Sequence, residues 1–354
     1  MRERSQHYFN NNQSITYVCE PLRIVVKSLN GTEKRTRTST GLPPLAPEAS
    51  VSTNSTTSAI DAKLLKFIGP VNYYFIGIPL LNELMHKPNV LMKEPFGFLN
   101  HLEKAIDACF ACIPRPRPAA KSISSSRLVA HRGAHDNNHL VQENTHAAFE
   151  AALALGCFGI EFDVHASADG VLVVNHDVTL KRLWGHDIDI QSHTFKELRA
   201  HAPALPSLAE VVTQYGKRMH LFIELKTPFN AVDTLIDALK NLTPCLDYHL
   251  LSLDDTLLPA LNLFPKQALL LVPEHNNVNA FYNLTLKHQY GGILSHYALL
   301  SAQKIKQLKA VQQMVGVGFV NSKFSLYREI NRGIPYLFTN NALAVSAYLK
   351  ALHG

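Results

Sequence analysis

The chain has 354 residues, 46% of them hydrophobic, which is enough apolar surface for a packed globular core. Its formal net charge of +6 lies entirely before residue 127, because residues 1–126 hold 15 Lys and Arg against 9 Asp and Glu, whereas residues 127–354 hold 19 against 19. The neutral C-terminal part has no basic surface for a phosphate backbone, which argues against nucleic acid as a partner.

The cysteine content and the N-terminal residues indicate the cellular compartment. Five cysteines are few and odd in number, so they predict no disulfide framework and favour a reducing compartment. The first residues carry charges, but no apolar run follows them, and a secretory signal peptide is therefore not expected. We predict a cytoplasmic location. The sequence does not indicate whether the protein is a monomer or an oligomer.

The N-terminal third divides into two segments. Residues 1–59 are predicted to be disordered, since residues 28–59 are rich in Ser, Thr, Asn and Pro and cannot bury enough apolar surface to offset chain entropy. Residues 60–122 are predicted to form an apolar and amphipathic helical extension that ends in a proline-rich linker. This extension either docks on the C-terminal domain or contacts a membrane peripherally through residues 60–113. A spanning helix is a third alternative, although prolines and glycines interrupt the most apolar run.

From residue 123 to residue 354, short β-rich runs alternate with helical patterns. Helix candidates include Thr145–Leu155, Ser207–Tyr215, Ala231–Leu242, Ser301–Val311 and Phe324–Arg332. The strand candidates are Leu128–His131, Gly159–Val164, Val171–Asn175, Met219–Leu225, Tyr248–Leu253, Ala268–Val272, Gly292–Leu294, Val315–Val320 and Tyr336–Thr339. About eight βα units in somewhat over 200 residues predict an α/β fold of the (β/α)8, or TIM, barrel type. A doubly wound sheet is the alternative, but no GxGxxG turn follows the first strand.

Several polar residues lie at the ends of the predicted strands. His131 ends the first strand, and His176 ends the third in this reading. Glu161 and Asp163 lie two residues apart on the second strand and therefore on the same face, while Glu224 ends the fourth. Strand ends meet at the C-terminal face of a barrel, so these groups are expected to converge.

The residue types at this face suit metal-assisted chemistry on a phosphate. Neighbouring carboxylates repel unless a cation lies between them, and the three hard oxygen ligands of Glu161, Asp163 and Glu224 favour Mg²⁺ or Ca²⁺. His131 and His176 have the right ordinary pKa to act as base and acid. Arg132 offers a planar fork for a phosphate.

These residues carry a family resemblance. In chain order, His131-Arg132-Gly133, Glu143-Asn144-Thr145, Glu161-Phe162-Asp163, His176-Asp177 and Glu224-Leu225-Lys226 resemble the signature of the glycerophosphodiester phosphodiesterase family. The resemblance implies a TIM barrel that uses one divalent cation to hydrolyse small glycerophosphodiesters to glycerol 3-phosphate and an alcohol. It implies that His131 and His176 are the acid/base pair, that Arg132 and Lys226 face the phosphate, and that Glu143 and Asn144 support Arg132.

Two positions depart from the family pattern. Gly318 stands where many members carry Trp, and Asn340 stands where many carry Asp, so the shape of the substrate pocket is not predicted. A related barrel enzyme of the phospholipase D or sphingomyelinase D type, acting on intact phospholipid, is the alternative function. The apolar, basic N-terminal part would suit such a membrane substrate.

Overall fold

The computed structural model describes residues 107–108, 110–274 and 276–353. The predicted disordered segment 1–59 and nearly all of the predicted extension 60–113, with its membrane-contact alternative, lie outside the described residues. Within the part of the chain that the structure describes, no helix is both long and apolar enough to cross a bilayer.

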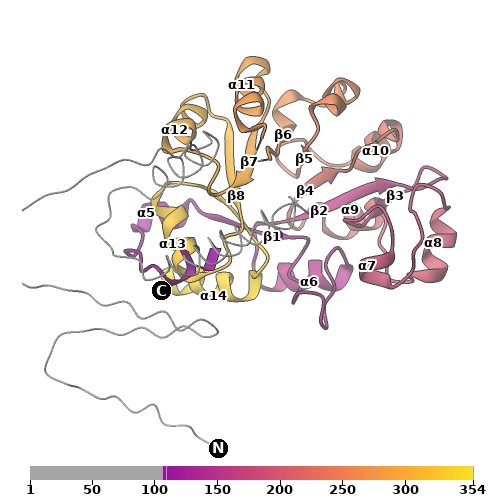
Figure 1. Ribbon diagram of the computed structural model, residues 1–354, viewed down its shortest axis with the longest axis horizontal. Helices are drawn as coiled ribbons and strands as arrows, with labels where there is room; N and C mark the ends of the chain where they lie inside the picture. Colours follow the sequence, from indigo (N-terminus) through magenta and orange to yellow (C-terminus); the bar gives the residue numbers. More distant parts are fainter. Residues whose placement is uncertain (1–106, 109, 275, 354) are drawn as a thin grey trace, which may run out of the picture. The chain divides into compact units, whose positions relative to one another are not determined.

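Eight parallel strands close into a barrel, which confirms the predicted fold class (Figure 1). Closure follows from β1, which pairs with β2 on one side and with β9 on the other. Going round from β1, the order is β2, β4, β5, β6, β7, β8 and β9. The strands are β1 (Arg127–His131), β2 (Gly159–Ala166), β4 (His220–Leu225), β5 (Tyr248–Ser252), β6 (Leu269–Leu271), β7 (Gly292–His296), β8 (Met314–Gly318) and β9 (Tyr336–Thr339).

One predicted barrel strand is not part of the barrel. The candidate at residues 171–175 forms β3 (Leu172–Val174), which pairs antiparallel with the end of β2 and leaves the ring to the other eight strands. Treating it as the third barrel strand was therefore wrong. The physical reason is chain length: only five residues separate β2 from β3, and a parallel crossover needs about a dozen or more.

Helices surround the barrel and connect its strands (Figure 1). Several begin at a Ser or Thr whose side chain accepts a hydrogen bond from the first turn, as Thr145 does from the backbone N–H of Ala148. The helices are α5 (Ala120–Ser124), α6 (His146–Ala154), α7 (Lys181–Trp184), α8 (Phe195–His201), α9 (Leu208–Tyr215), α10 (Val232–Leu239), α11 (Val278–His288), α12 (Ala302–Ala310), α13 (Lys323–Asn331) and α14 (Ala342–His353), with 3₁₀ turns η1 (Asp255–Leu261) and η2 (Lys266–Ala268).

Alternate residues of the strands face two different cores. Outward residues such as Ile160 and Ile223 pack in the large cluster beneath the helices. Inward residues from six strands form a second apolar cluster inside the barrel, made of Val129, Phe222, Leu251, Leu270, Leu294 and Phe338. Because Phe222 and Glu224 share a face of β4, the next inward position toward the carboxyl end is acidic. The apolar cluster therefore forms the floor beneath the polar strand ends.

Residues before β1 also pack on the barrel helices. The ring of Phe110 meets that of Tyr297 edge-on at 5.6 Å, and the guanidinium of Arg328 lies 4.3 Å from the Phe110 ring centre. Arg117 Nη2 donates to the carbonyl of Leu352 at 2.9 Å, and Ile123 of α5 is buried. This segment, assigned from the sequence to the extension and linker, thus contributes to the same apolar core.

Candidate active site

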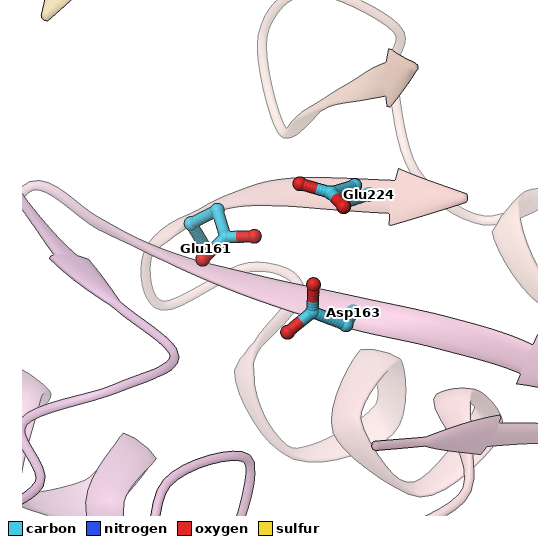
Figure 2. A group of neighbouring side chains, drawn as sticks. All are labelled: Glu161, Asp163 and Glu224. Atoms are coloured by element: carbon cyan, nitrogen blue, oxygen red, sulfur yellow. The ribbon is translucent and has the colours of Figure 1, made fainter. Parts of the chain in front are cut away.

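Three carboxylates on the neighbouring strands β2 and β4 converge (Figure 2). Glu161 and Asp163 share one face of β2, and Asp163 is in register with Glu224 on the neighbouring parallel strand. Each residue offers a carboxylate oxygen, and these oxygens all lie within 4.8 Å of one another. The predicted convergence of Glu161, Asp163 and Glu224 is therefore confirmed as geometry.

Burial and charge act differently on the three acids. Burial, followed by the neighbouring carboxylates, raises the pKa of Glu161 well above its usual range, and raises that of Glu224 for the same reasons. Burial also opposes the charge of Asp163, but Lys226 and Arg132 overcome it and lower the pKa of this acid. Asp163 is the carboxylate that stays ionised beside two cations.

Two cations complete the site. Lys226 Nζ lies 2.8 Å from Asp163 Oδ1 and also donates to Glu224 Oε1. Arg132 Nε lies 3.4 Å from Asp163 Oδ2, and the backbone N–H of Arg132 donates to Glu161 Oε2 at 3.1 Å. Three acids and two cations thus share one end of the barrel, and the carboxylates outnumber the cations by one.

A strained turn after β1 places Arg132. Arg132 has φ 57°, Gly133 has φ 82°, and a Cβ on Gly133 would lie 2.7 Å from Cβ of Ala148, so only glycine fits there. The backbone N–H of Asn144 donates to the carbonyl of Arg132 at 2.9 Å. The Asn144 side chain donates to Asp163 Oδ2 at 2.9 Å, so it orients both the turn and the acid.

Glu143 holds the outer side of Arg132. Its Oε1 accepts from Arg132 Nη1 at 3.0 Å and from Arg182 Nη2 at 2.7 Å. Arg182 also pairs with Asp177 at 2.5 Å and so links the two loops. Sequence reasoning missed Arg182, because it lies on α7, outside every motif that the sequence offered.

His131 stands between the carboxylates and the end of β9. Its Nε2 lies 3.6 Å from Glu161 Oε2, and its Nδ1 donates to Oδ1 of Asn340. Burial, followed by the charge of Arg132, lowers the pKa of His131 to about 4. The ring is therefore neutral at neutral pH, which is the form that accepts a proton.

His176 reaches the site from β3 and not from a barrel strand. Its Nδ1 lies 2.7 Å from Asp177 Oδ1, and its backbone carbonyl accepts from Nε2 of His165 at 3.1 Å. Burial lowers the pKa of His176, although the charge of Asp163 opposes this. His165, which the sequence reading did not single out, thereby fixes the backbone at His176.

A cavity of about 180 Å³ opens beside the cluster. Its lining includes His176, Glu224 and Lys226, together with the apolar side chains of Val178 and Leu253. His131 and Glu161 are not among the lining residues. The structure thus brings His176 to the cavity beside the cluster and places His131 on the side of β9, where its side chain is 27% exposed.

The carboxylate set fits a hard divalent cation. Glu161 Oε1 is buried and has no hydrogen-bond partner in the described structure, which is costly for a carboxylate oxygen unless a cation satisfies it. Glu161, Asp163 and Glu224 offer oxygen ligands only, as Mg²⁺ and Ca²⁺ require. Residues 161, 163 and 224 would hold such an ion.

A family comparison agrees with this geometry. The model of the glycerophosphoryl diester phosphodiesterase family matches residues 131–318, more than half of the 354-residue chain. The chain belongs to this family. The matched region begins at His131 and contains every predicted site residue.

Curated relatives in the family match over shorter stretches. A glycerophosphodiester phosphodiesterase of Caldanaerobacter subterraneus subsp. tengcongensis is 43% identical over 112 residues, which are 28% of this chain and 45% of that enzyme. A lysophospholipase D of Rattus norvegicus is 38% identical over 73 residues, which are 21% of this chain and 22% of that protein. The chain spans less than half the length of these curated relatives.

Solved structures of family members share the fold over almost their whole length. A glycerophosphodiester phosphodiesterase from Thermotoga maritima has a TM-score of 0.55 and 25% identity, and the match covers 64% of this chain and 98% of that one. A phosphodiesterase from Oleispira antarctica, solved in complex with its product sn-glycerol-3-phosphate, has a TM-score of 0.54 and 23% identity, with 66% and 99% covered.

Proposed function

We propose that this chain hydrolyses glycerophosphodiesters to glycerol 3-phosphate and an alcohol, with one divalent cation and with His131 and His176 as the acid/base pair. The observation that carries the proposal is the buried cluster of Glu161, Asp163 and Glu224, with an unpartnered Glu161 oxygen and two cations beside it. The family membership and the product-bound relative support the same chemistry.

The cation is Mg²⁺ or Ca²⁺ in this proposal, held by the three carboxylates. When bound, it would supply positive charge to a phosphate oxygen and lower the pKa of an attacking hydroxyl. Side chains of the protein would bind the phosphate and transfer the protons.

Arg132 and Lys226 would bind the phosphodiester anion. Burial opposes the charge of both side chains, but Asp163 raises the pKa of each, so both remain cationic. Glu143 and Asn144 hold the turn that carries Arg132. The guanidinium fork is thus oriented before substrate arrives, which lowers the entropy lost on binding.

The two histidines would move the protons. One takes the proton of the attacking hydroxyl, which is water or the neighbouring glycerol hydroxyl, as the new P–O bond forms. The other gives a proton to the alkoxide as the P–O bond to the alcohol breaks. His176 lines the cavity and carries Asp177 on its Nδ1, which orients its Nε2 for this transfer.

A direct assay tests the proposal. The purified full chain is incubated with glycerophosphocholine and Mg²⁺, Ca²⁺ or a chelator, and glycerol 3-phosphate is measured. We expect product only with a divalent cation, and no turnover by His131→Ala or His176→Ala. His139→Ala, which removes an exposed histidine of the same loop, is the matched control. Full activity in both histidine variants would contradict the assignment of His131 and His176 as the acid/base pair.

Apolar side chains near the site favour a second candidate, an enzyme that acts on phospholipid or lysophospholipid. Val178 lines the cavity and is 52% exposed, and Phe319, whose ring lies 6.5 Å from that of His131, is 39% exposed. Exposed apolar groups at a site fit an acyl chain. Faster turnover of lipid vesicles than of glycerophosphocholine would favour this candidate.

A further inference from the structure

Asn340 contacts His131, one of the two histidines of the proposed acid/base pair. It follows the last barrel strand, β9, and its side-chain Oδ1 accepts a hydrogen bond from Nδ1 of His131. The other ring nitrogen of His131, Nε2, points the opposite way and lies 3.6 Å from Glu161 Oε2. The imidazole therefore bridges Asn340 and the carboxylate cluster.

The amide oxygen decides which ring nitrogen carries the proton. An amide oxygen can only accept, so Nδ1 of His131 must be the donor. A neutral imidazole has one ring proton, and its other nitrogen then has an open lone pair. With Asn340 on Nδ1, the nitrogen without a proton is Nε2, on the side of Glu161.

Asn340 is itself held from a second loop. Its backbone N–H donates to Oδ1 of Asn321 at 2.8 Å, and the hydroxyl of the preceding Thr339 donates to the same oxygen at 3.1 Å. The Asn341 side chain donates to the carbonyl of Asn321 at 3.3 Å. The backbone that carries the Asn340 side chain is therefore fixed by the loops that follow β8 and β9.

We propose that Asn340 is a positioning residue that holds His131 in the Nδ1–H tautomer, so that Nε2 is the nitrogen that exchanges protons in the reaction. The kinetic consequence rests on the proposed function, but the tautomer itself does not. The part of Asn340 that matters is its oxygen. An aspartate at this position keeps an oxygen acceptor, whereas an alanine does not.

The tautomer is measured first, on the full chain without substrate and with a chelator present. Protein carrying ¹⁵N-labelled histidine is studied by NMR at mildly alkaline pH, and the His131 signals are assigned by their loss in His131→Gln. We expect a protonated, pyrrole-type Nδ1 and a pyridine-type Nε2 in the wild type. Asn340→Ala should shift both signals toward the values of a tautomer mixture. A pyrrole-type Nε2 in the wild type would overturn the proposal.

Kinetics then test the consequence. We expect Asn340→Ala to lower kcat roughly 10- to 100-fold, as loss of an orienting partner typically does, with little change in KM. Asn340→Asp should retain most of the wild-type kcat. Asn241→Ala removes an exposed amide after α10, outside the candidate site, and it should leave kcat unchanged.

Two kinetic results would contradict the proposal. One is an Asn340→Ala enzyme with the kcat of the wild type. The other is an Asn340→Asp enzyme as impaired as Asn340→Ala, because the oxygen acceptor would then not matter. Unfolding temperatures of all variants separate these results from loss of fold. If the wild type hydrolyses no diester, the proposed function fails, while the NMR measurement still tests the tautomer.

Discussion

His220 and His249 lie inside the barrel at the end opposite the carboxylate cluster, and acid is expected to destabilise the fold through them. His220 Nδ1 donates to the carbonyl of Leu246 at 3.0 Å, and a 2.8 Å hydrogen bond joins His220 Nε2 to His249 Nδ1. Both side chains are buried, and burial lowers the pKa of His220 from 6.5 to about 4 and that of His249 to about 3.

The direction in which pH changes the free energy of unfolding follows from these lowered pKa values. Above pH 6.5 both the folded and unfolded states hold neutral histidines, and the pair has no pH-dependent effect. Between pH 6.5 and about 4 only the unfolded state binds protons, so the free energy of unfolding falls as the pH falls. Each histidine costs about 1.4 kcal/mol per pH unit, or about 2 kcal/mol at roughly pH 5, and the pair about 4. This is a large share of a typical stability of about 5–15 kcal/mol.

Urea unfolding at two pH values measures the effect. The free energy of unfolding at neutral pH minus that at about pH 5 is compared between the wild type and the His220→Leu/His249→Leu double variant. The double variant should lose about 4 kcal/mol less on acidification. His139→Leu, at an exposed loop position, should behave as the wild type. An equal pH effect in the wild type and the double variant would refute this reasoning.

Three further predictions concern the loops and the N-terminal segment. Gly133→Ala should destabilise the fold by about 2 kcal/mol or more in urea unfolding, because its φ is 82° and the added Cβ would clash with Ala148. Arg182→Met should lower kcat roughly tenfold without unfolding the protein, since Glu143 and Asp177 lose their shared partner; unchanged kinetics would contradict it. A chain that starts at residue 119 should melt below one that starts at residue 107, because Phe110 packs on Tyr297.

The strands and the carboxylate cluster could be predicted because period and position are local signals. The alternation in β2 places Glu161 and Asp163 on one face whatever surrounds it, and a parallel barrel brings Glu224 to the same end. The barrel and the carboxylate cluster therefore followed from residue order, although one of the nine strand candidates lies outside the ring.

Other parts depended on tertiary pairing that one sequence does not reveal. The short connection to β2 makes β3 antiparallel. The pattern of a short apolar run does not distinguish a parallel strand from an antiparallel one. Arg182 and Asn340 act through contacts across 39 and 209 residues of sequence, and no spacing rule connects positions so far apart. In the sequence Asn340 is only a departure from the family pattern, and its contact with His131 depends on the pairing of β9 with β1.

The candidate site is complete only when the barrel is closed, because β1 pairs with both β2 and β9. β1 pairs with strands from both ends of the barrel sequence: its register with β2 sets His131 against Glu161, and its register with β9 brings Asn340 to the same imidazole. A half-barrel produced alone would hold the carboxylates but lack the Asn340 side of His131. Two separately expressed halves should therefore recover turnover only when they reassociate across this seam, which would make activity a measure of assembly.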